Sequence, residues 1–368
     1  MKRLHICKYF DDSMVHVKLI KGLDAASGTK GDVYISSHTK VLNDNVCGSV
    51  FGGRVERVGY GNILKYFFII RSLVSLIFLI RRFTIKNYSI LFCHTLVVDG
   101  LLGYLCFKVF KVPYVILVRN SDLLFYYKNF IWLRFLFRRI LSHAELVGFP
   151  SFAMEDLLYN TIPDVNLRKT KLWNNGIDQF WLDKVPEAKT AKKSETGNTV
   201  VFVGRFNENK NLRNLVYAID ELSSKVPGLK LVCVGGTCSD FNRVFPELDL
   251  NSRDFISFKG CLEPTDLINI LDDSDCLCVP SFRETFGLVY VEALSRGVPV
   301  VCSSGQGVDG FFDEGVVTVD PKSANSISDG LELALSVKDL QPKKLNLERF
   351  DWRGVTAQIK EDLDEILL

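Results

Sequence analysis

The sequence predicts an α/β protein with two doubly wound domains, each built on a parallel sheet. Its 368 residues exceed the roughly 250 that one hydrophobic core usually organises. Two series of short β-rich runs alternate with longer helical patterns, and a polar stretch at 185–198 separates the series. With 47% hydrophobic and 24% charged residues, the chain has the composition of a folded protein and not of a disordered one.

The first series predicts a parallel sheet with crossover helices. Its strands are expected where apolar runs are rich in β-branched and aromatic residues, at 5–9, 33–36, 89–93, 114–118 and 145–149. Arg71 interrupts the most hydrophobic helical pattern, 63–83, so no uncharged run approaches the ~18 residues of a membrane-spanning helix. We expect this pattern to form a packed helix of the first domain.

The second series predicts another parallel sheet after the polar stretch. Its strands are expected at 199–203, 230–234, 255–258, 276–279, 298–302 and 316–319. The stretch 185–198 contains few apolar residues and is expected to be a linker or an exposed loop. The predicted organisation is a first domain at 1–178, a linker at 179–198, a second domain at 199–345 and a C-terminal helix at 346–368.

Global charge and cysteine placement exclude several classes of protein. The 45 Lys and Arg residues against 43 Asp and Glu give a net charge of +2, too small for a dedicated nucleic-acid binder. The ten cysteines lack C-x-x-C spacing and the five histidines do not cluster near them in the sequence, so neither a zinc site nor a disulfide framework is expected. The N-terminal residues lack a signal-length apolar stretch, so a cytoplasmic location is expected.

Candidate chemistry is concentrated in the segment 280–297, between two predicted strands of the second domain. Ligands of open α/β sheets bind at the carboxyl ends of strands, where helix N-termini present unpaired N–H groups to anions. Gly287 would let the backbone of Gly287 and Leu288 approach a phosphate closely. Glu284 and Glu292 would grip hydroxyls at separate points of one elongated ligand. The alternative is a capping acid followed by a solvated helix face.

A second candidate site follows the first predicted strand of the same domain. Gly204, Arg205 and Lys210 lie in the turn after this strand. Two cations beside a tight glycine turn suit a diphosphate, because arginine binds phosphate oxygens in a fork and lysine adds a point charge. The alternative is a loop of solvated basic residues.

Taken together, these positions resemble a known family. The turn with Gly204, Arg205 and Lys210, followed by a spaced set downstream, resembles the donor domain of family four retaining glycosyltransferases, which have the GT-B fold. The spaced set is Pro280, Ser281, Glu284, Phe286, Gly287, Leu288, Glu292, Ala293, Gly297, Pro299 and Val300. The resemblance covers 199–320. In the first half, 175–178 and His94 resemble family positions, and 350–367 resembles a helical tail that packs back toward the first domain.

The resemblance implies a GT-B architecture, with two Rossmann-like domains facing across a cleft and the C-terminal helix returning toward the first. The first domain would bind the acceptor and the second the donor, a nucleotide-diphosphate sugar, with UDP-sugars favoured. No other cofactor and no metal are implied, because preorganised cations would stabilise the charge of the departing diphosphate. The anomeric configuration of the sugar would be retained.

The same resemblance implies a role for each matched residue. Arg205 and Lys210 would hold the diphosphate, and Glu284 would bind the transferred sugar, which makes these three the implied catalytic residues. Glu292 would bind the ribose. Further donor contacts are implied for Gly204, Cys261, Leu262, Phe286, Gly287 and Leu288.

The first domain departs from the family pattern. The segment 11–13 stands where members often carry a glycine-rich loop, and 119–122 stands where many carry a histidine that touches the sugar, so the donor sugar is left open. Asn120 either replaces one hydrogen bond of that histidine or caps the next segment. A structural role is the alternative reading for His94. Further candidates on the acceptor side are Asp11, His16 and His94.

Two other segments allow alternative readings. The Asp-x-Asp sequence at 273–275 resembles a motif that binds the donor's cation in glycosyltransferases of another fold, but here it precedes a predicted strand instead of following one. The segment 126–143 mixes aromatic residues with cations that share an arc of a helical wheel, namely Lys128, Arg134, Arg138 and Arg139. It is either an interfacial helix that brings the acceptor domain to anionic lipid or a domain helix with solvated cations.

The sequence therefore predicts a metal-independent retaining glycosyltransferase. Its expected product is a surface polysaccharide, a lipopolysaccharide or a lipid-linked saccharide made at the cytosolic membrane face. Two other functions stay open, a sugar-nucleotide epimerase of the same fold and a non-catalytic sugar-nucleotide-binding subunit of a glycosyltransferase complex. The joint presence of Arg205, Lys210, Glu284 and Glu292 argues against the last of these.

Overall fold

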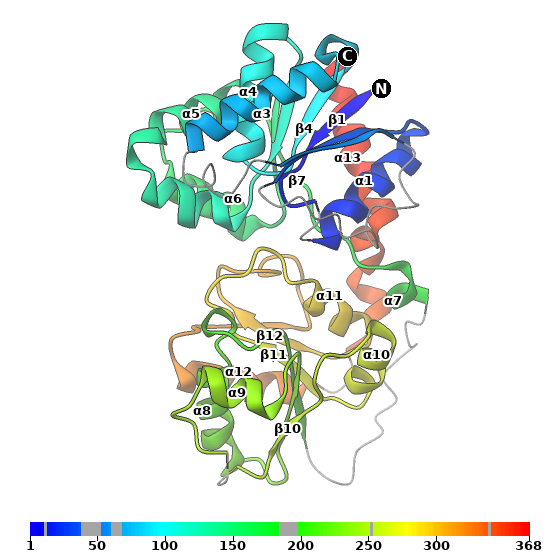
Figure 1. Ribbon diagram of the computed structural model, residues 1–368. Helices are drawn as coiled ribbons and strands as arrows, with labels where there is room; N and C mark the ends of the chain where they lie inside the picture. The colour runs from blue at the N-terminus through cyan, green and yellow to red at the C-terminus, as the bar shows by residue number, and fades with distance from the viewer. Residues whose placement is uncertain (11–12, 38–52, 60–67, 184–197, 251–252, 338–339) are drawn as a thin grey trace. The chain divides into compact units, whose positions relative to one another are not determined.

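A computed structural model describes residues 1–10, 13–37, 53–59, 68–183, 198–250, 253–337 and 340–368. The chain forms two compact units (Figure 1). The first unit comprises 1–176 and 352–368, and the second comprises 177–351. Nearly all of the expected linker at 185–198, and Asp11 of the candidate site, lie outside the described residues.

The first unit contains a seven-stranded parallel sheet with the order β3-β2-β1-β4-β5-β6-β7. Its strands are β1 (Arg3–Ile6), β2 (Asp32–Ser37), β3 (Val55–Gly59), β4 (Ile90–Cys93), β5 (Tyr114–Leu117), β6 (Leu146–Phe149) and β7 (Thr170–Leu172). The sequence predicted the five central strands and missed the two edge strands. β3 and β7 lack fully buried apolar runs, because an edge strand has fewer neighbours to cover it.

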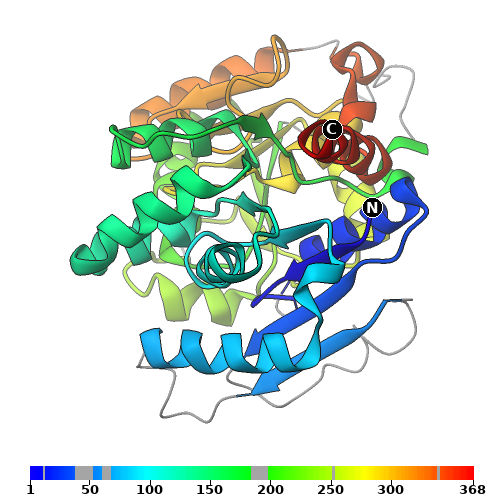
Figure 2. The same cartoon turned by 90° about the horizontal axis from the view of Figure 1, so that it is seen from above.

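Helices cover both faces of this sheet. They are α1 (Met14–Ser27), α3 (Phe68–Arg82), α4 (Val98–Phe110), α5 (Arg134–His143), α6 (Phe152–Thr161) and α13 (Trp352–Leu367). Alternate residues of β4 serve the two faces: Leu91 and Cys93 join the core under α3, α4 and α5, whereas Ile90 and Phe92 join the core under α1 and α13. The light-blue α3 lies beside the edge of the sheet that ends in β3 (Figure 2).

The C-terminal helix returns to the first unit, as predicted. α13 packs against α1, and the indole N–H of Trp173 donates to Asp362 at 2.8 Å. Lys171 Nζ lies 2.8 Å from the same buried carboxylate. A β-carbon at Gly176 would come within 2.6 Å of the Trp352 ring, so the chain passes close under the start of this helix.

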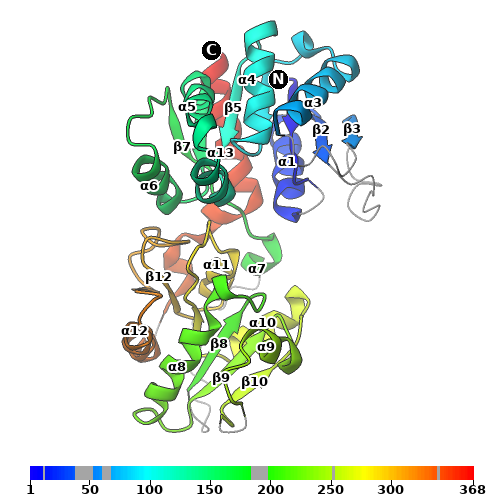
Figure 3. The ribbon, with the colours of Figure 1, turned by 60° about the vertical axis from the view of Figure 1, so that its left-hand side comes forward.

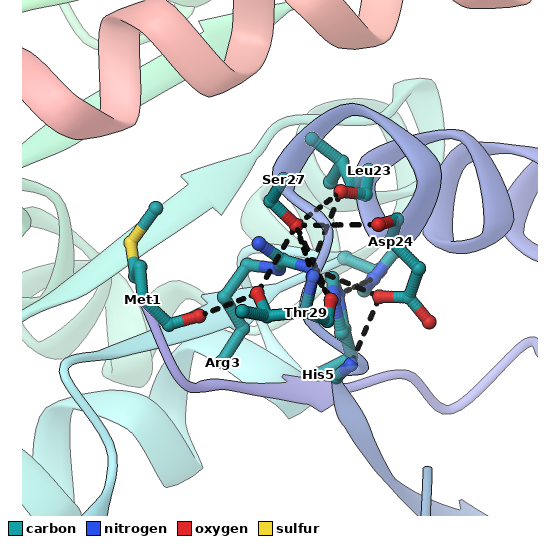
Figure 4. A network of polar contacts seen from close by, with 9 residues as sticks. Met1, Arg3, His5, Leu23, Asp24, Ser27 and Thr29 are labelled. Atoms are coloured by element: carbon teal, nitrogen blue, oxygen red, sulfur yellow. Dashed lines mark hydrogen bonds and ion pairs between the residues drawn. The ribbon is translucent and has the colours of Figure 1, made fainter. Parts of the chain in front are cut away.

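Buried Arg3 on β1 ties this strand to the end of α1 (Figure 4). Its guanidinium donates to Asp24 Oδ1 at 2.9 Å and to the carbonyl of Thr29 at 2.8 Å. The same carboxylate accepts from the backbone N–H of Gly31 at 2.9 Å. These bonds hold α1 in place against β1, and they therefore also help to position His16 near the start of α1.

The second unit contains a six-stranded parallel sheet with the order β10-β9-β8-β11-β12-β13 (Figure 3). Its strands are β8 (Thr199–Val203), β9 (Lys230–Val234), β10 (Ile256–Phe258), β11 (Cys276–Val279), β12 (Val300–Ser303) and β13 (Val316–Val319). Its helices are α7 (Gln179–Asp183), α8 (Leu212–Ser223), α9 (Cys238–Val244), α10 (Pro264–Asp272), α11 (Leu288–Ser295) and α12 (Ala324–Ser336). All six predicted strands are present, so the two-sheet prediction is confirmed.

Two helical predictions are refined by the structure. Among the described residues, no helix combines the length and the apolar character that a bilayer crossing requires. The segment 126–143 is not one helix, because it is divided among a π-helical turn (Asp122–Tyr127), a 3-10 turn (Ile131–Leu133) and α5. Its residues therefore do not share the single helical wheel that the sequence suggested.

Candidate functional site

The first candidate site lies at the carboxyl ends of β8 and β11. These strands are neighbours in the middle of the second sheet, and the strand order reverses between them. Loops diverge at such a point and leave room for a ligand. The loop after β8 carries Gly204, Arg205 and Lys210, and the loop after β11 carries Glu284 and Gly287.

Glycine allows the turns at this point to pack closely. Gly235, which follows β9, has a φ of 114°, a region that other residues rarely adopt. A β-carbon there would lie 2.3 Å from the carbonyl oxygen of Gly204. The Gly204 N–H in turn donates to the carbonyl of Val234 at 2.9 Å. The predicted glycine turn is therefore held against the end of the next strand.

Backbone and amide hydrogen bonds join the two loops. The N–H of Phe282 donates to the carbonyl of Asn209 at 2.8 Å, and the Asn209 amide donates to the carbonyl of Arg283 at 2.9 Å. Asn211 reinforces the junction through its amide, which donates to the carbonyl of Pro280 at 3.0 Å. These bonds thus join two segments into one surface, although Lys210 and Glu284 are 74 residues apart in the chain.

An ion pair lies at the centre of this surface. Lys210 Nζ is 2.5 Å from Glu284 Oε2, and the two side chains are 22% and 15% exposed. The backbone N–H of Glu284 donates to Gln306 Oε1 at 2.9 Å, and its carbonyl accepts from the N–H of Gly307 at 3.2 Å. The structure thus places the predicted sugar-binding carboxylate beside a predicted phosphate-binding cation.

Helix α11 begins immediately after this loop. Gly287 has a φ of 78°, and a β-carbon there would lie 2.3 Å from the Tyr290 ring. Only glycine fits this turn without displacing that ring. The first N–H groups of α11, from Leu288 onward, carry the partial positive charge that favours an anion.

The remaining donor candidates differ in exposure. Arg205 is exposed, and Glu292 is half-buried one turn into α11. Cys261 is exposed and Leu262 half-buried, and both follow β10 beside Gly260, whose carbonyl accepts from the N–H of Gly235 at 2.6 Å. These positions leave their side chains or backbones accessible at the carboxyl end of the sheet.

Phe286 lies in the core of the second unit. Its ring is fully buried and packs against Phe311 and Phe350, with ring centroids 5.7 and 5.6 Å apart. Its position therefore supports the loop that carries Glu284 rather than a contact with a ligand. The Asp-x-Asp sequence also makes a structural contact, because Asp275 accepts a hydrogen bond from the N–H of Thr199 at 2.8 Å, at the start of β8.

The second candidate site lies at the carboxyl ends of β1 and β4, where the strand order of the first sheet reverses. His94 directly follows β4 and is completely buried. Its Nδ1 is 3.1 Å from Nδ1 of His16 on α1, and its Nε2 is 3.1 Å from Nδ1 of His5 on β1. Burial lowers the pKa of His16 to about 3 and lowers those of His5 and His94, so all three rings are neutral at pH 7.

Two buried carboxyl groups that are not among the predicted site residues accept hydrogen bonds from the segments that follow β1 and β4. Asp122 accepts from the backbone N–H groups of Leu96, Val97 and Arg119, at 3.1, 3.3 and 2.9 Å. Asp99 accepts from the N–H of Lys8 at 3.1 Å and from the hydroxyl of Thr95 at 3.0 Å. Burial raises the pKa of Asp122 to about 6 and that of Asp99 to about 8.

Arg119 follows β5, where many members of the resembled family carry histidine. Its Nη1 donates to Asn175 Oδ1 at 3.2 Å. Its Nε and Nη2 are buried and have no hydrogen-bond partner within the described ranges of the chain. Burial lowers the pKa of Arg119 to about 10, so it remains cationic at pH 7. The half-buried Asn120 is adjacent.

Residues 184–346 match the family described as glycosyl transferases group 1. This match covers less than half of the chain and lies within the second unit. An uncharacterized glycosyltransferase of Methanocaldococcus jannaschii is 26% identical over 218 residues, which make up 55% of this chain and 54% of the relative. The chain thus spans about half the length of this curated relative.

Solved structures have the same architecture over the whole chain. The apo form of the lipopolysaccharide outer core galactosyltransferase WaaB gives a TM-score of 0.75 at 14% identity, over 99% of each chain. Anabaena Alr3699/HepE, in a complex with UDP-glucose, gives 0.70 at 16% identity, over 99% of this chain and 100% of that one. This chain therefore has the GT-B fold, as the sequence predicted.

Proposed function

We propose that this chain is a retaining glycosyltransferase that takes a sugar from a nucleotide-diphosphate donor, with UDP-sugars favoured. The observation that carries the proposal is the Lys210–Glu284 pair beside the N-terminus of α11, at the strand-order reversal of the second sheet. A cation, a carboxylate and unpaired N–H groups are the three groups that a diphosphate sugar requires. The UDP-glucose bound by the Anabaena structural neighbour supports this donor class.

The proposed chemistry assigns each group a task. Lys210, exposed Arg205 and the α11 N–H groups neutralise the departing diphosphate, where negative charge grows as the glycosidic bond breaks. Glu284 accepts hydrogen bonds from the transferred sugar, and Glu292 accepts from the ribose. These groups replace the charge that a metal would supply, so we propose transfer without a divalent cation. The acceptor hydroxyl attacks from the leaving-group side, a diphosphate oxygen takes its proton, and the configuration is retained.

The acceptor is proposed to be a saccharide or a lipid-linked saccharide of surface polysaccharide or lipopolysaccharide synthesis. The inverted polarity of α3 supports a membrane setting. Its exposed residues are Ile70, Leu73, Ile77, Phe78 and Ile80, between 38% and 49% exposed. Its buried face carries Arg71, Ser72 and Ser75 together with the core residue Leu79, and Ser75 is bonded to Ser36 and Tyr34 of β2. An outward apolar face on a helix end with Arg81 and Arg82 suits an anionic lipid surface.

A second exposed patch on the same unit supports that setting. Ile131 and Trp132 are both 65% exposed, and Phe135 is 69% exposed. The guanidinium of Arg139 stacks on Phe135 at 4.9 Å, and that of Arg134 stacks on Tyr127 at the same distance. Arg138 is 4.0 Å from the exposed Asp164. Aromatic groups with adjacent cations are typical of interfacial anchors.

The test is donor turnover with and without acceptor. Purified protein is incubated with a panel of nucleotide-diphosphate sugars, alone and with a panel of alkyl glycosides, and released nucleotide and sugar products are measured. Transfer predicts nucleotide release that depends on the glycoside, with a glycosylated product. Free sugar without acceptor would identify an epimerase, and binding without turnover would identify a non-catalytic subunit.

A matched pair of lysine variants tests the site itself. Lys210→Gln should lower turnover at least about tenfold, because one charged hydrogen bond to the leaving group is lost. Lys225→Gln is the control, since Lys225 belongs to an exposed pair of the same unit, 3.9 Å from Glu332. Equal turnover of the two variants would refute the role proposed for Lys210.

A further inference from the structure

The reversal point of the first sheet brings together three side chains with metal-ligating atoms. Cys7 follows β1, His16 lies in the first turn of α1, and His94 follows β4. One ligand atom from each lies within 4.8 Å of the others, and all three residues are buried. The long gap between positions 16 and 94 hid this cluster from the sequence, which predicted no metal site.

Distances within the cluster are close to those of a metal site. Two nitrogen ligands of a tetrahedral zinc ion lie about 3.3 Å apart when each Zn–N bond is about 2.0 Å. The Nδ1 atoms of His16 and His94 are 3.1 Å apart. Only a small separation of the rings is needed to admit an ion between them and the Cys7 thiol.

His5 supplies the outer support that metal-bound histidines usually have. His94 Nε2 is 3.1 Å from Nδ1 of His5. If Nε2 of His94 carries the proton and donates it to His5, then Nδ1 of His94 presents its lone pair toward His16. A ligating histidine typically has its second nitrogen held in this way, which fixes both tautomer and ring orientation.

We propose that Cys7, His16 and His94 form a zinc-binding site, with His5 as its outer-shell support. One thiolate and two imidazoles suit zinc(II), and three protein ligands leave the fourth position for water or an exogenous ligand. The site goes beyond the proposed transfer reaction, because its ligands all belong to the first unit whereas the donor groups all belong to the second. The proposal of a zinc site does not depend on whether the chain transfers a sugar.

The charged surroundings indicate what the fourth ligand is. Arg119 interacts electrostatically with Cys7, His16 and His94, and its Nε and Nη2 atoms are buried without partners in the described structure. This buried cation opposes a bare divalent ion and favours an anion beside it. Asp99 accepts from the N–H of Lys8, next to Cys7, and Asp122 accepts from the N–H of Leu96, two residues after His94, so backbone groups already hold both carboxyls. An anionic fourth ligand, such as hydroxide, fits the position best.

The experiment measures metal content and the optical signature of thiolate ligation on the full chain. Protein purified with zinc and dialysed is expected to retain about one zinc ion per chain by atomic emission. Replacement by cobalt(II) is expected to produce a near-ultraviolet thiolate-to-metal band together with visible bands of tetrahedral cobalt. Magnesium should give neither. Absence of stoichiometric zinc and of the thiolate band in the wild type would overturn the proposal and leave a hydrogen-bonded histidine chain.

Variants separate this site from the other thiols. Cys7→Ser should abolish the thiolate band, and His16→Gln should remove bound zinc, whereas Cys261→Ser and His143→Gln should retain both signals as exposed-thiol and distant-histidine controls. His5→Gln should lower the affinity for zinc about 10- to 100-fold while keeping the thiolate band. A band that survives Cys7→Ser would overturn the assignment.

A measurement on the wild type covers variants that fail to fold. Zinc should raise its melting temperature relative to chelator-treated protein, because a ligand that binds only the folded state stabilises it. Magnesium at the same concentration should not. An unchanged melting temperature with zinc would count against the site even without any variant.

Discussion

Removal of two glutamates of the second unit is expected to change different quantities, donor binding in one case and turnover in the other. Glu292 is proposed to bind the ribose, a part of the donor that does not change during transfer, so its contact is similar in the ground and transition states. Glu284 is proposed to bind the sugar that gains positive charge as the bond breaks. Glu292→Ala should weaken donor and nucleotide-diphosphate binding, and Glu284→Ala should lower turnover, each by at least about tenfold.

Calorimetry with nucleotide diphosphate and turnover at saturating donor distinguish these roles. The control is Glu332→Ala, which removes an exposed carboxylate of the same unit. If Glu284→Ala loses nucleotide affinity while Glu292→Ala loses only turnover, the two assignments are reversed. If neither variant differs from the control, both residues are solvated acids without a role in the donor site.

A chelator test addresses the cations that are proposed to take the place of a metal. Arg205 and Lys210 are proposed to neutralise the diphosphate without a divalent ion, so transfer should continue in excess EDTA. Loss of activity that magnesium or manganese restores would contradict this role and revive the Asp-x-Asp sequence at 273–275. Loss of activity that only zinc restores would instead indicate that the zinc site of the first unit was emptied. It would not contradict the role proposed for the two cations.

The buried histidines of the first unit make its stability sensitive to acid. Their folded-state pKa values lie below those of the unfolded chain, so the stabilisation is complete above about pH 6.5 and is lost as the pH falls toward the folded values. Asp99 and Asp122 oppose this trend because burial raises their pKa values. The three histidines are therefore expected to lower the free energy of unfolding as the pH falls from 7 to 5, and the two carboxyls to offset part of this loss.

Urea unfolding in chelator at the two pH values measures this loss. Trp173 and Trp352 are buried in the first unit and report its unfolding by fluorescence. His16→Leu removes one of the three titrating rings and should reduce the acid sensitivity, whereas His143→Gln should preserve it. Equal pH dependence of wild type and His16→Leu would show that this histidine does not titrate on unfolding as proposed.

At the scale of elements, membrane binding is predicted for two exposed surfaces of the first unit. Replacing Arg134, Arg138 and Arg139 together with Gln should weaken co-sedimentation with anionic vesicles while the protein stays folded. Binding by the wild type should also decrease at high salt, because surface charges are screened. Unchanged vesicle binding by the triple variant would rule out the basic aromatic segment as the anchor.

A separate pair of variants tests the outward face of α3. Leu73→Gln with Ile77→Gln should weaken binding to neutral and anionic vesicles alike, because the contribution is apolar. Leu333→Gln on α12 is the control, since Leu333 is an exposed apolar residue of the second unit. If the α3 variant binds like the control, the inverted polarity of this helix serves another contact.

At the scale of the whole molecule, the C-terminal helix completes a unit that the chain began at its other end. Asp362 of α13 accepts from Trp173 and pairs with Lys171, although its carboxylate is almost fully buried. Asp362→Ala leaves the indole N–H of Trp173 unsatisfied, which costs about 1 to 3 kcal/mol. Asp364→Ala on the same helix removes only an exposed pair with Lys360 and should cost little.

Unit-specific readouts check this prediction. Chemical unfolding followed by tryptophan fluorescence should detect the loss in the first unit, while nucleotide binding by the second unit should be unchanged. Equal destabilisation by Asp362→Ala and Asp364→Ala would mean that the buried pair contributes nothing beyond an exposed one. Loss of nucleotide binding in Asp362→Ala would mean that the two units do not respond separately.

The sequence by itself determined the two parallel sheets and the composition of the donor loops, whereas the family resemblance implied the returning C-terminal helix. The first two features follow from local signals: buried strands are continuous apolar runs, and a glycine turn with Arg205 and Lys210 is contiguous in the chain. The edge strands β3 and β7 escaped because their residues are only partly covered. The segment 126–143 was wrongly taken as one helix, since periodicity does not show where a turn interrupts it.

Only the tertiary structure decided which distant residues meet. It brought Lys210 to Glu284 through hydrogen bonds between two loops, and it buried Phe286 in a cluster of aromatic rings instead of leaving it to a ligand. It also joined Cys7, His16 and His94. The physical reason is that neighbouring strands of a parallel sheet are separated in sequence by whole crossover helices, so spacing along the chain carries no measure of distance at the strand ends.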